Sequence, residues 1–165
     1  MATKAPMKTE NGQKTEHGQT QISDFLAQAV SDLTDLRLQV KQSHWNLTGR
    51  GFIGIHKLLD QLADELDETV DTAAERQRAL GFLTHGTARH VAKTSKLAQA
   101  SAERHSVEEI VRHLVEQYCA CSKASQESAK GCEEHEDLAT SDLFNDTTRM
   151  LDQHRYLLQS NLDQE

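Results

Sequence analysis

After a single proline at position 6, nothing bars a long helix in this chain, and apolar residues recur at helical spacing from residue 22 onward. Of its 165 residues, 36% are hydrophobic and only 4% are aromatic. A core with so few aromatic side chains must rely on Leu, Val, Ile and Ala, which suits packed helices better than a sandwich of sheets. We therefore predict an all-α fold.

The first half of the folded region is expected to be a helical hairpin. One amphipathic helix spans residues 22–48 and ends near Gly49; a second spans 53–80 and is followed by Gly81, which can adopt the left-handed backbone that ends helices. The turn between them is short, so the two helices should be antiparallel neighbours. Residues 1–21 are polar and lack periodicity, which predicts a disordered tail.

The second half is expected to contain another hairpin, reached through a long crossover. A structureless stretch as long as 81–105 is unusual in a compact domain, so we predict a short helix near 89–99. Ser106 and Glu109 then match a capping box, which starts a third long helix. We expect that helix to end at Gly131.

The last helix is predicted over 140–163. Two hairpins joined by a long crossover describe a ferritin-like four-helix bundle, here over residues 22–165. The chain has no apolar run long enough for a transmembrane helix and no apolar signal-peptide core. We expect a cytoplasmic protein, in which Cys119, Cys121 and Cys132 are ordinary thiols and not a shared zinc site.

Two imidazoles and three carboxylates at helical spacing are the candidate metal ligands: His44, His56, Asp60, Asp71 and Glu75. Such side chains bind iron, manganese or zinc. On the second predicted helix, the four later residues fall on a different face from the apolar stripe. A run of acidic residues on a helix is usually a solvated face, and this remains the competing interpretation. The added histidines favour a metal site.

One chain should not complete this site by itself. Asp60 and Asp71 lie about 16 Å apart along a helix, whereas a metal bonds its ligands at about 2 Å. An antiparallel copy related by a two-fold axis would bring His56 and Asp60 of one chain against Asp71 and Glu75 of the other, giving two equal sites. The formal net charge of −8 also favours cations as partners.

The chain resembles the Dps family, the DNA-binding proteins from starved cells, also called miniferritins, over residues 22–163. The start of the last predicted helix also looks like that family. The resemblance is carried by His44-Trp45-Asn46-Leu47-Thr48-Gly49 with His56 and Asp60, by Asp71-Thr72-Ala73-Ala74-Glu75-Arg76, and by Ala139-Thr140-Ser141-Asp142-Leu143-Phe144.

This resemblance implies a hollow dodecamer that oxidises Fe(II), preferably with hydrogen peroxide, stores the ferric mineral and protects DNA from oxidative damage. It implies that His44, His56 and Asp60 form one half of a ferroxidase site, and that Asp71 and Glu75 come from the two-fold partner. Two alternatives remain: an architectural cage that compacts the nucleoid with little iron chemistry, and a plain helical interaction module. An intrachain di-iron centre is disfavoured, because no glutamate is followed by histidine three positions later.

Three further residues have competing explanations. By the resemblance, Trp45 is a sacrificial electron donor; otherwise it is a large side chain that fills an interface. By the same resemblance, Asp137 and Asp142 line a pore through which iron enters; otherwise they cap the last helix and compensate its dipole.

Evidence for DNA binding in the tail is weak. Lys4, Lys8 and Lys14 are the candidate DNA contacts, but Glu10 and Glu16 leave the tail with a side-chain charge of only +1. Many mobile tails on one shell could still bind through weak, salt-sensitive contacts. We expect little binding at physiological salt.

Overall fold

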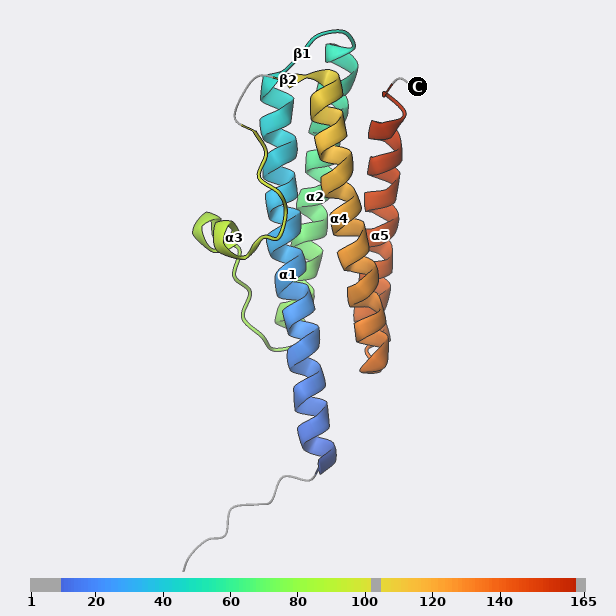
Figure 1. Cartoon of the computed structure of the whole chain (residues 1–165). Helices are drawn as coiled ribbons and strands as arrows, with labels where there is room; N and C mark the ends of the chain where they lie inside the picture. The colour runs from blue at the N-terminus through green and yellow to red at the C-terminus, as the bar shows by residue number, and fades with distance from the viewer. Residues whose placement is uncertain (1–9, 102–104, 163–165) are drawn as a thin grey trace, which may run out of the picture.

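The computed structural model describes residues 10–101 and 105–162, which form a bundle of four long helices (Figure 1). The elements in chain order are α1 (Glu10–Asn46), β1 (Leu47–Thr48), α2 (Phe52–Ala79), α3 (Ala88–Thr94), β2 (His105–Ser106), α4 (Val107–Glu134) and α5 (Leu138–Gln159). The predicted four-helix bundle with a short crossover helix is confirmed, although α3 is shorter than the predicted 89–99. Within the described ranges, no helix is both long and apolar enough to cross a membrane.

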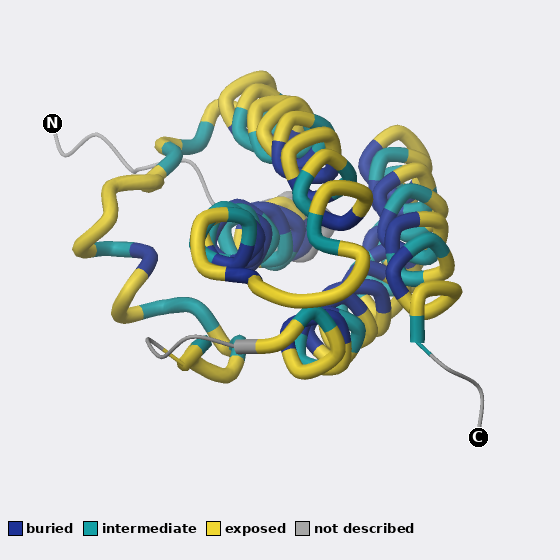
Figure 2. The backbone as a smooth tube through the Cα atoms, turned by 90° about the horizontal axis from the view of Figure 1, so that it is seen from above, coloured by how far each residue is buried: buried dark blue, intermediate teal, exposed yellow. Residues whose placement is uncertain are grey.

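Each long helix turns its apolar stripe toward the middle of the bundle, as the end-on view in Figure 2 shows. Leu36 of α1, Leu62 of α2, Leu114 of α4 and Leu151 of α5 are all fully buried. Burying one such side chain is worth about 1.5–3 kcal/mol. Packing of these stripes therefore holds the helices together more than helix propensity does.

The helix α4 starts as predicted and ends later than predicted. Ser106 Oγ accepts a hydrogen bond from Glu109 N at 3.2 Å, and the Glu109 carboxylate accepts one from Ser106 N at 2.8 Å. Gly131 lies within the helix and does not end it. Glycine is needed there because a Cβ would lie 2.5 Å from the ring of Phe25 on α1. The chain turns instead at Glu136, whose φ is 60°.

The crossover runs beside α1 and is fastened to it by polar side chains of that helix. Val91 is the buried apolar anchor of α3. Beyond it, α1 side chains bond successive backbone groups of the crossover at 2.8–3.0 Å: Gln28 to Thr94 O, Asp32 to Lys96 N, Gln39 to Ala98 O and Gln42 to Ser101 O. These four positions recur at helical spacing, so they lie along one side of α1.

A two-residue parallel ladder joins β1 to β2 and was not predicted. Leu47 pairs with His105, and Thr48 pairs with Ser106. The end of α1 and the start of α4 lie at the same end of the bundle (Figure 1), so two short extended segments distant in sequence can meet there. The ladder fixes the chain directly after the predicted ligand His44.

The first helix begins earlier than the predicted residue 22, because α1 starts at Glu10. The early part of the helix packs on the turn between α4 and α5: Gly18 is buried against the ring of His135, whose Nε2 lies 2.5 Å from Gln21 Oε1. The rest of the predicted tail, residues 1–9, lies outside the described residues.

Candidate metal centre

The end of α1 and the start of α2 place two histidine rings against each other. His44 and His56 stack with ring centroids 3.7 Å apart and an interplanar angle of 19°. Each Nδ1 lies beside the other residue's backbone carbonyl, at 2.8 Å for His44 and 3.0 Å for His56. A carbonyl only accepts hydrogen bonds, so each Nδ1 carries the proton. In the neutral ring this tautomer leaves the lone pair on Nε2, which is the form of imidazole that binds metals.

Asp60 lies one helical turn after His56 and approaches His44. Its Oδ1 is 4.0 Å from His44 Nε2 and 2.5 Å from Lys41 Nζ. The hydrogen bond and charge of Lys41, with smaller contributions from the two histidines, hold the pKa of Asp60 below its usual value. The carboxylate is therefore ionised at neutral pH and attracts cations, while Lys41 occupies one of its oxygens.

Asp71 and Glu75 are exposed on the same helix, about three and four turns beyond Asp60. α2 runs without a break from Phe52 to Ala79, so its rise keeps Asp71 about 16 Å from Asp60. Across the part of the chain that the structure describes, no three His, Cys, Asp or Glu side chains converge closely enough to hold a metal ion. The five predicted ligands thus form two separate groups within one protomer.

The other acidic residues of α2 have different surroundings. Asp67 forms an ion pair with Arg37 of α1 at 2.8 Å. Farther along, Glu68 lines an open groove of about 460 Å³ between α2 and α5, together with Asp142 and Asp146. The carboxylates of α2 therefore do not share one environment.

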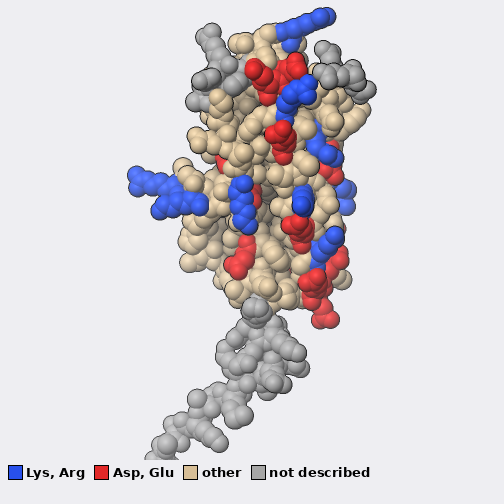
Figure 3. Space-filling model, in the orientation of Figure 1, with Lys and Arg blue, Asp and Glu red and all other residues tan. Residues whose placement is uncertain are grey.

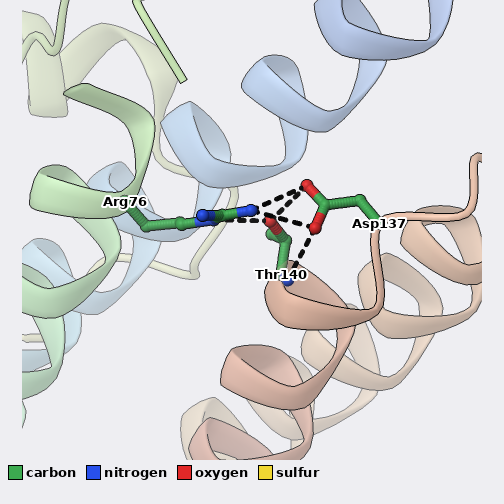
Figure 4. Close-up of polar contacts among 3 residues, drawn as sticks. All are labelled: Arg76, Asp137 and Thr140. Carbon is green, nitrogen blue, oxygen red and sulfur yellow. Dashed lines mark hydrogen bonds and ion pairs between the residues drawn. The ribbon is translucent and has the colours of Figure 1, made fainter. Parts of the chain in front are cut away.

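Asp137 is engaged as a helix cap and in an ion pair with α2 (Figure 4). Arg76 Nη2 lies 2.9 and 3.1 Å from the two Asp137 oxygens, and Arg76 Nε donates to Thr140 Oγ1 at 2.9 Å. Thr140 N also donates to Asp137 at 3.0 Å. Burial raises the pKa of Asp137, but the hydrogen bonds from Thr140 and the charge of Arg76 outweigh it, so the pKa lies below its usual value. For Asp137 the capping interpretation is the one observed, whereas Asp142 is exposed.

The other predicted functional residues lie apart from these contacts. Trp45 is 70% exposed in the single protomer, beside His44. Of the candidate DNA contacts, Lys4 and Lys8 lie outside the described residues, and the side chain of Lys14 is not among those described.

The three cysteines are free thiols. Cys119 is exposed, whereas Cys121 and Cys132 are buried. Burial raises the pKa of Cys132 to about 12 and that of Cys121 still further, which keeps both thiols protonated.

Sequence reasoning missed two polar residues near the ligands. Lys41 lies three positions before His44, a spacing that places both on one side of α1, but its contact with Asp60 depends on how α1 and α2 pack. His154 of α5 is 1% exposed and its Nε2 lies 2.6 Å from Glu65 Oε2 of α2, between the two ligand groups.

Comparison with known proteins decides the family. A family described as Ferritin-like domain matches residues 23–165. The DNA protection during starvation protein of Agrobacterium fabrum is 31% identical over 157 residues, which cover 95% of this chain and 96% of that protein. The chain belongs to the Dps family. The bundle described above is accordingly the ferritin-like fold of Dps proteins.

Solved Dps structures have the same fold. The Dps of Microbacterium arborescens in the high iron form is 29% identical, with a TM-score of 0.81 over 87% of this chain and 93% of that one. DpsC from Streptomyces coelicolor is 25% identical, with a TM-score of 0.86 over 90% of this chain and 88% of that one.

Proposed function

We propose that this Dps-family protein is a ferroxidase that oxidises Fe(II), preferably with hydrogen peroxide, at sites shared by two subunits. The ferric product would be stored inside a hollow dodecamer in the cytoplasm, which limits oxidative damage to DNA. The observation that carries the proposal is the stacked His44–His56 pair, in which each Nδ1 lies beside a backbone carbonyl and His44 Nε2 lies 4.0 Å from Asp60 Oδ1. The solved relative in a high iron form supports iron as the metal.

The two ligand groups account for a shared site. In one protomer, His44, His56 and Asp60 offer two imidazole nitrogens and one carboxylate. Asp71 and Glu75 offer two more carboxylates, too far along α2 to reach the same ion. A two-fold axis that pairs antiparallel copies of α2 brings each group against the other group of its partner, so every dimer gains two complete sites.

The chemistry assigned to these residues is the binding of Fe(II) as substrate. Two Fe(II) ions each lose one electron, and one hydrogen peroxide takes up both electrons with two protons to give two water molecules. The imidazoles bind Fe(II), and the carboxylates stabilise the higher charge of Fe(III). The backbone carbonyls that accept from each Nδ1 fix the ring tautomers and orientations.

Subunit complementation tests this proposal. We expect His56→Ala and Glu75→Ala each to abolish rapid Fe(II) oxidation, because each change damages both sites of a homodimer. When the two variants are co-expressed, a mixed dimer has one site with all its native ligands, so random mixing should restore about a quarter of the wild-type sites. Fe(II) oxidation is followed anaerobically after addition of peroxide.

The matched control co-expresses His56→Ala with Asp60→Ala. These changes lie in the same half-site, so every site of a mixed dimer stays damaged and no activity should return. Equal recovery in both mixtures, or recovery in neither, would contradict a site shared between subunits.

A further inference from the structure

Two histidines of the crossover lie against each other on the outside of the bundle. The rings of His85 and His90 have centroids 5.4 Å apart and an interplanar angle of 39°. His85 is exposed and His90 is half-buried, so solvent reaches the pair. No described residue forms a hydrogen bond or an ion pair with either ring, whereas the rings of His135 and His154 each bond another side chain. The pair therefore offers two imidazoles whose nitrogens are not used by the fold.

The backbone on both sides of this pair is held in place. Before it, Thr84 Oγ1 donates to Gln77 Oε1 of α2 at 2.8 Å. In the first turn of α3, His90 N donates to Thr87 O at 2.8 Å, and the next residue, Val91, is buried against the bundle. A ligand that bonds both rings would order two side chains on a backbone that is already fixed, which lowers the entropic cost of binding.

The separation of the two rings fits a single metal ion between them. A transition metal bonds an imidazole nitrogen at about 2.0–2.1 Å, so it lies about 3.2 Å from the centroid of each ring that it bonds. The two centroids are then about 4.5 Å apart for a right angle at the metal and about 5.2 Å apart for a tetrahedral angle. The observed 5.4 Å is close to the tetrahedral value. Rotation of the side chains, without movement of the backbone, can aim one nitrogen of each ring at the ion.

The surroundings of the pair restrict which metal can bind. α3 projects from the side of α1 in Figure 1, and Figure 3 shows Lys and Arg atoms on the same projection. Residues 76–102 contain five Arg or Lys residues and no Asp or Glu. Mg(II) and Ca(II) need oxygen ligands, which this segment does not offer as carboxylates. Imidazole suits Cu(II), Ni(II) and Zn(II), and Cu(II) forms the strongest complexes in this series. The positive surroundings thus favour the ion with the strongest bonds to nitrogen.

We propose that His85 and His90 form a surface site for Cu(II), with water in the remaining coordination positions. The site is separate from the five candidate ferroxidase ligands, which belong to α1 and α2 and not to the crossover. It uses nitrogen ligands alone, whereas the candidate ferroxidase site combines imidazoles with carboxylates. The proposal concerns binding of Cu(II) and does not depend on oxidation of Fe(II). Each subunit would carry one such site.

Titration of full-length protein with Cu(II) tests this site. All preparations carry Cys119→Ser, because an exposed thiol would compete for copper. They also carry His44→Gln/His56→Gln, which removes the competing imidazoles of the candidate ferroxidase site. This background protein is compared with the same protein carrying either His85→Gln or His90→Gln. Calorimetry at pH 7.5 measures affinity and stoichiometry, and electron paramagnetic resonance of the bound Cu(II) counts its nitrogen ligands.

We expect the background protein to bind one Cu(II) per chain, with coupling to two nitrogens in its spectrum. His85→Gln and His90→Gln should each weaken this binding at least tenfold and leave coupling to a single nitrogen. The matched control is His135→Gln, which removes a histidine on the turn between α4 and α5 and should leave the affinity unchanged. Equal affinity in all these proteins, or an equal loss in the control, would show binding by scattered histidines and overturn the site.

A further measurement keeps this proposal distinct from the proposed function. In protein that retains His44 and His56, the substitution His85→Gln should leave the rate of Fe(II) oxidation at the wild-type value. A slower rate would overturn the separation of the two sites. Cu(II) binding that depends on the crossover pair, in a protein that fails to oxidise Fe(II), supports the copper site and refutes the ferroxidase.

Discussion

The two halves of α2 differ in how their candidate ligands are held. In the N-terminal half, His56 and Asp60 contact His44 and Lys41 of the same protomer. In the C-terminal half, the carboxylates of Asp71 and Glu75 are exposed, although the backbone there is fastened to α5 through Arg76. One group is thus organised within its own chain, whereas the other is held at a fixed place with its carboxylates open. For the proposed shared site, a single protomer therefore prepares both halves without completing either.

The largest expected effect is a loss of stability on breaking the contact between Asp137 and Arg76 at the C-terminal half of α2. Asp137→Ala removes the acceptor that caps α5 and the partner of Arg76. An N-cap contributes about 1 kcal/mol and hydrogen bonds between charged groups about 1.5–3 kcal/mol, so the free energy of unfolding should fall by about 3 kcal/mol. Urea denaturation measures the change. Asp142→Ala, an exposed position on the same helix, is the control and should change stability by less than about 0.5 kcal/mol.

Between the two halves of α2, Glu65 contacts the buried His154 of α5. This contact predicts that the stability of the fold depends on pH. Burial lowers the pKa of His154 more than the hydrogen bond to Glu65 raises it. The geometry agrees: Nε2 faces Glu65, and no described residue partners Nδ1, so a second proton would place an unsatisfied donor in the core.

Because the folded pKa of His154 lies below its unfolded value of 6.5, its contribution is present at pH 7.5 and is lost as the pH falls toward 5.5. Thermal unfolding over this range should show a falling Tm in the wild type and a shallower fall in His154→Gln. His85→Gln, at an exposed position, should keep the wild-type slope. A His154→Gln variant with an unchanged slope would show that other groups cause the pH dependence.

At the N-terminal half, Lys41 competes with a cation for Asp60. Replacing it in Lys41→Gln removes a unit positive charge and frees one carboxylate oxygen, so Fe(II) affinity should rise roughly fivefold. Anaerobic Fe(II) titration measures the affinity, and Lys57→Gln on the exposed side of α2 serves as the control. Weaker binding in Lys41→Gln would instead mean that Lys41 orients Asp60 for the metal.

The smallest expected effect on stability is at the open carboxylates. Glu75→Gln should leave the free energy of unfolding within about 0.5 kcal/mol of wild type, because an exposed side chain outside the core contributes little. The same substitution should nevertheless impair Fe(II) oxidation. A large loss of stability would show that Glu75 has a structural partner, and the contrast between the two halves of α2 would then fail.

Helix boundaries show where local sequence stops being sufficient. Gly81 and Gly131 look alike in the sequence, each at the end of an apolar stripe. Gly81 has φ 90° and ends α2 as predicted, whereas α4 continues through Gly131 to make room for Phe25. That distinction depends on which ring of α1 faces the glycine. The part of α1 just before residue 22 likewise packs against His135, far away in the sequence.

In the candidate site too, relations within one helix could be predicted from the sequence, whereas contacts between helices could not. Periodicity alone separated Asp60 from Asp71 and kept both off the apolar stripe, because those relations lie within one helix. The stacked rings of His44 and His56 and the contact from Lys41 cross between α1 and α2, so only the packed structure reveals them. The role of Asp137 was undecided from sequence, since its partner Arg76 is on another helix.

The hydrogen bonds between α1 side chains and the crossover backbone affect which substitutions the crossover tolerates. Four backbone groups of the crossover bond to side chains of α1, so the crossover keeps its path whatever side chains it exposes. Substitutions on its exposed face can therefore alter the surface of the crossover while the candidate metal ligands of α1 and α2 and the interior stay as they are. Because its backbone is held by α1 and not by its own side chains, the crossover is a suitable place to graft a foreign peptide.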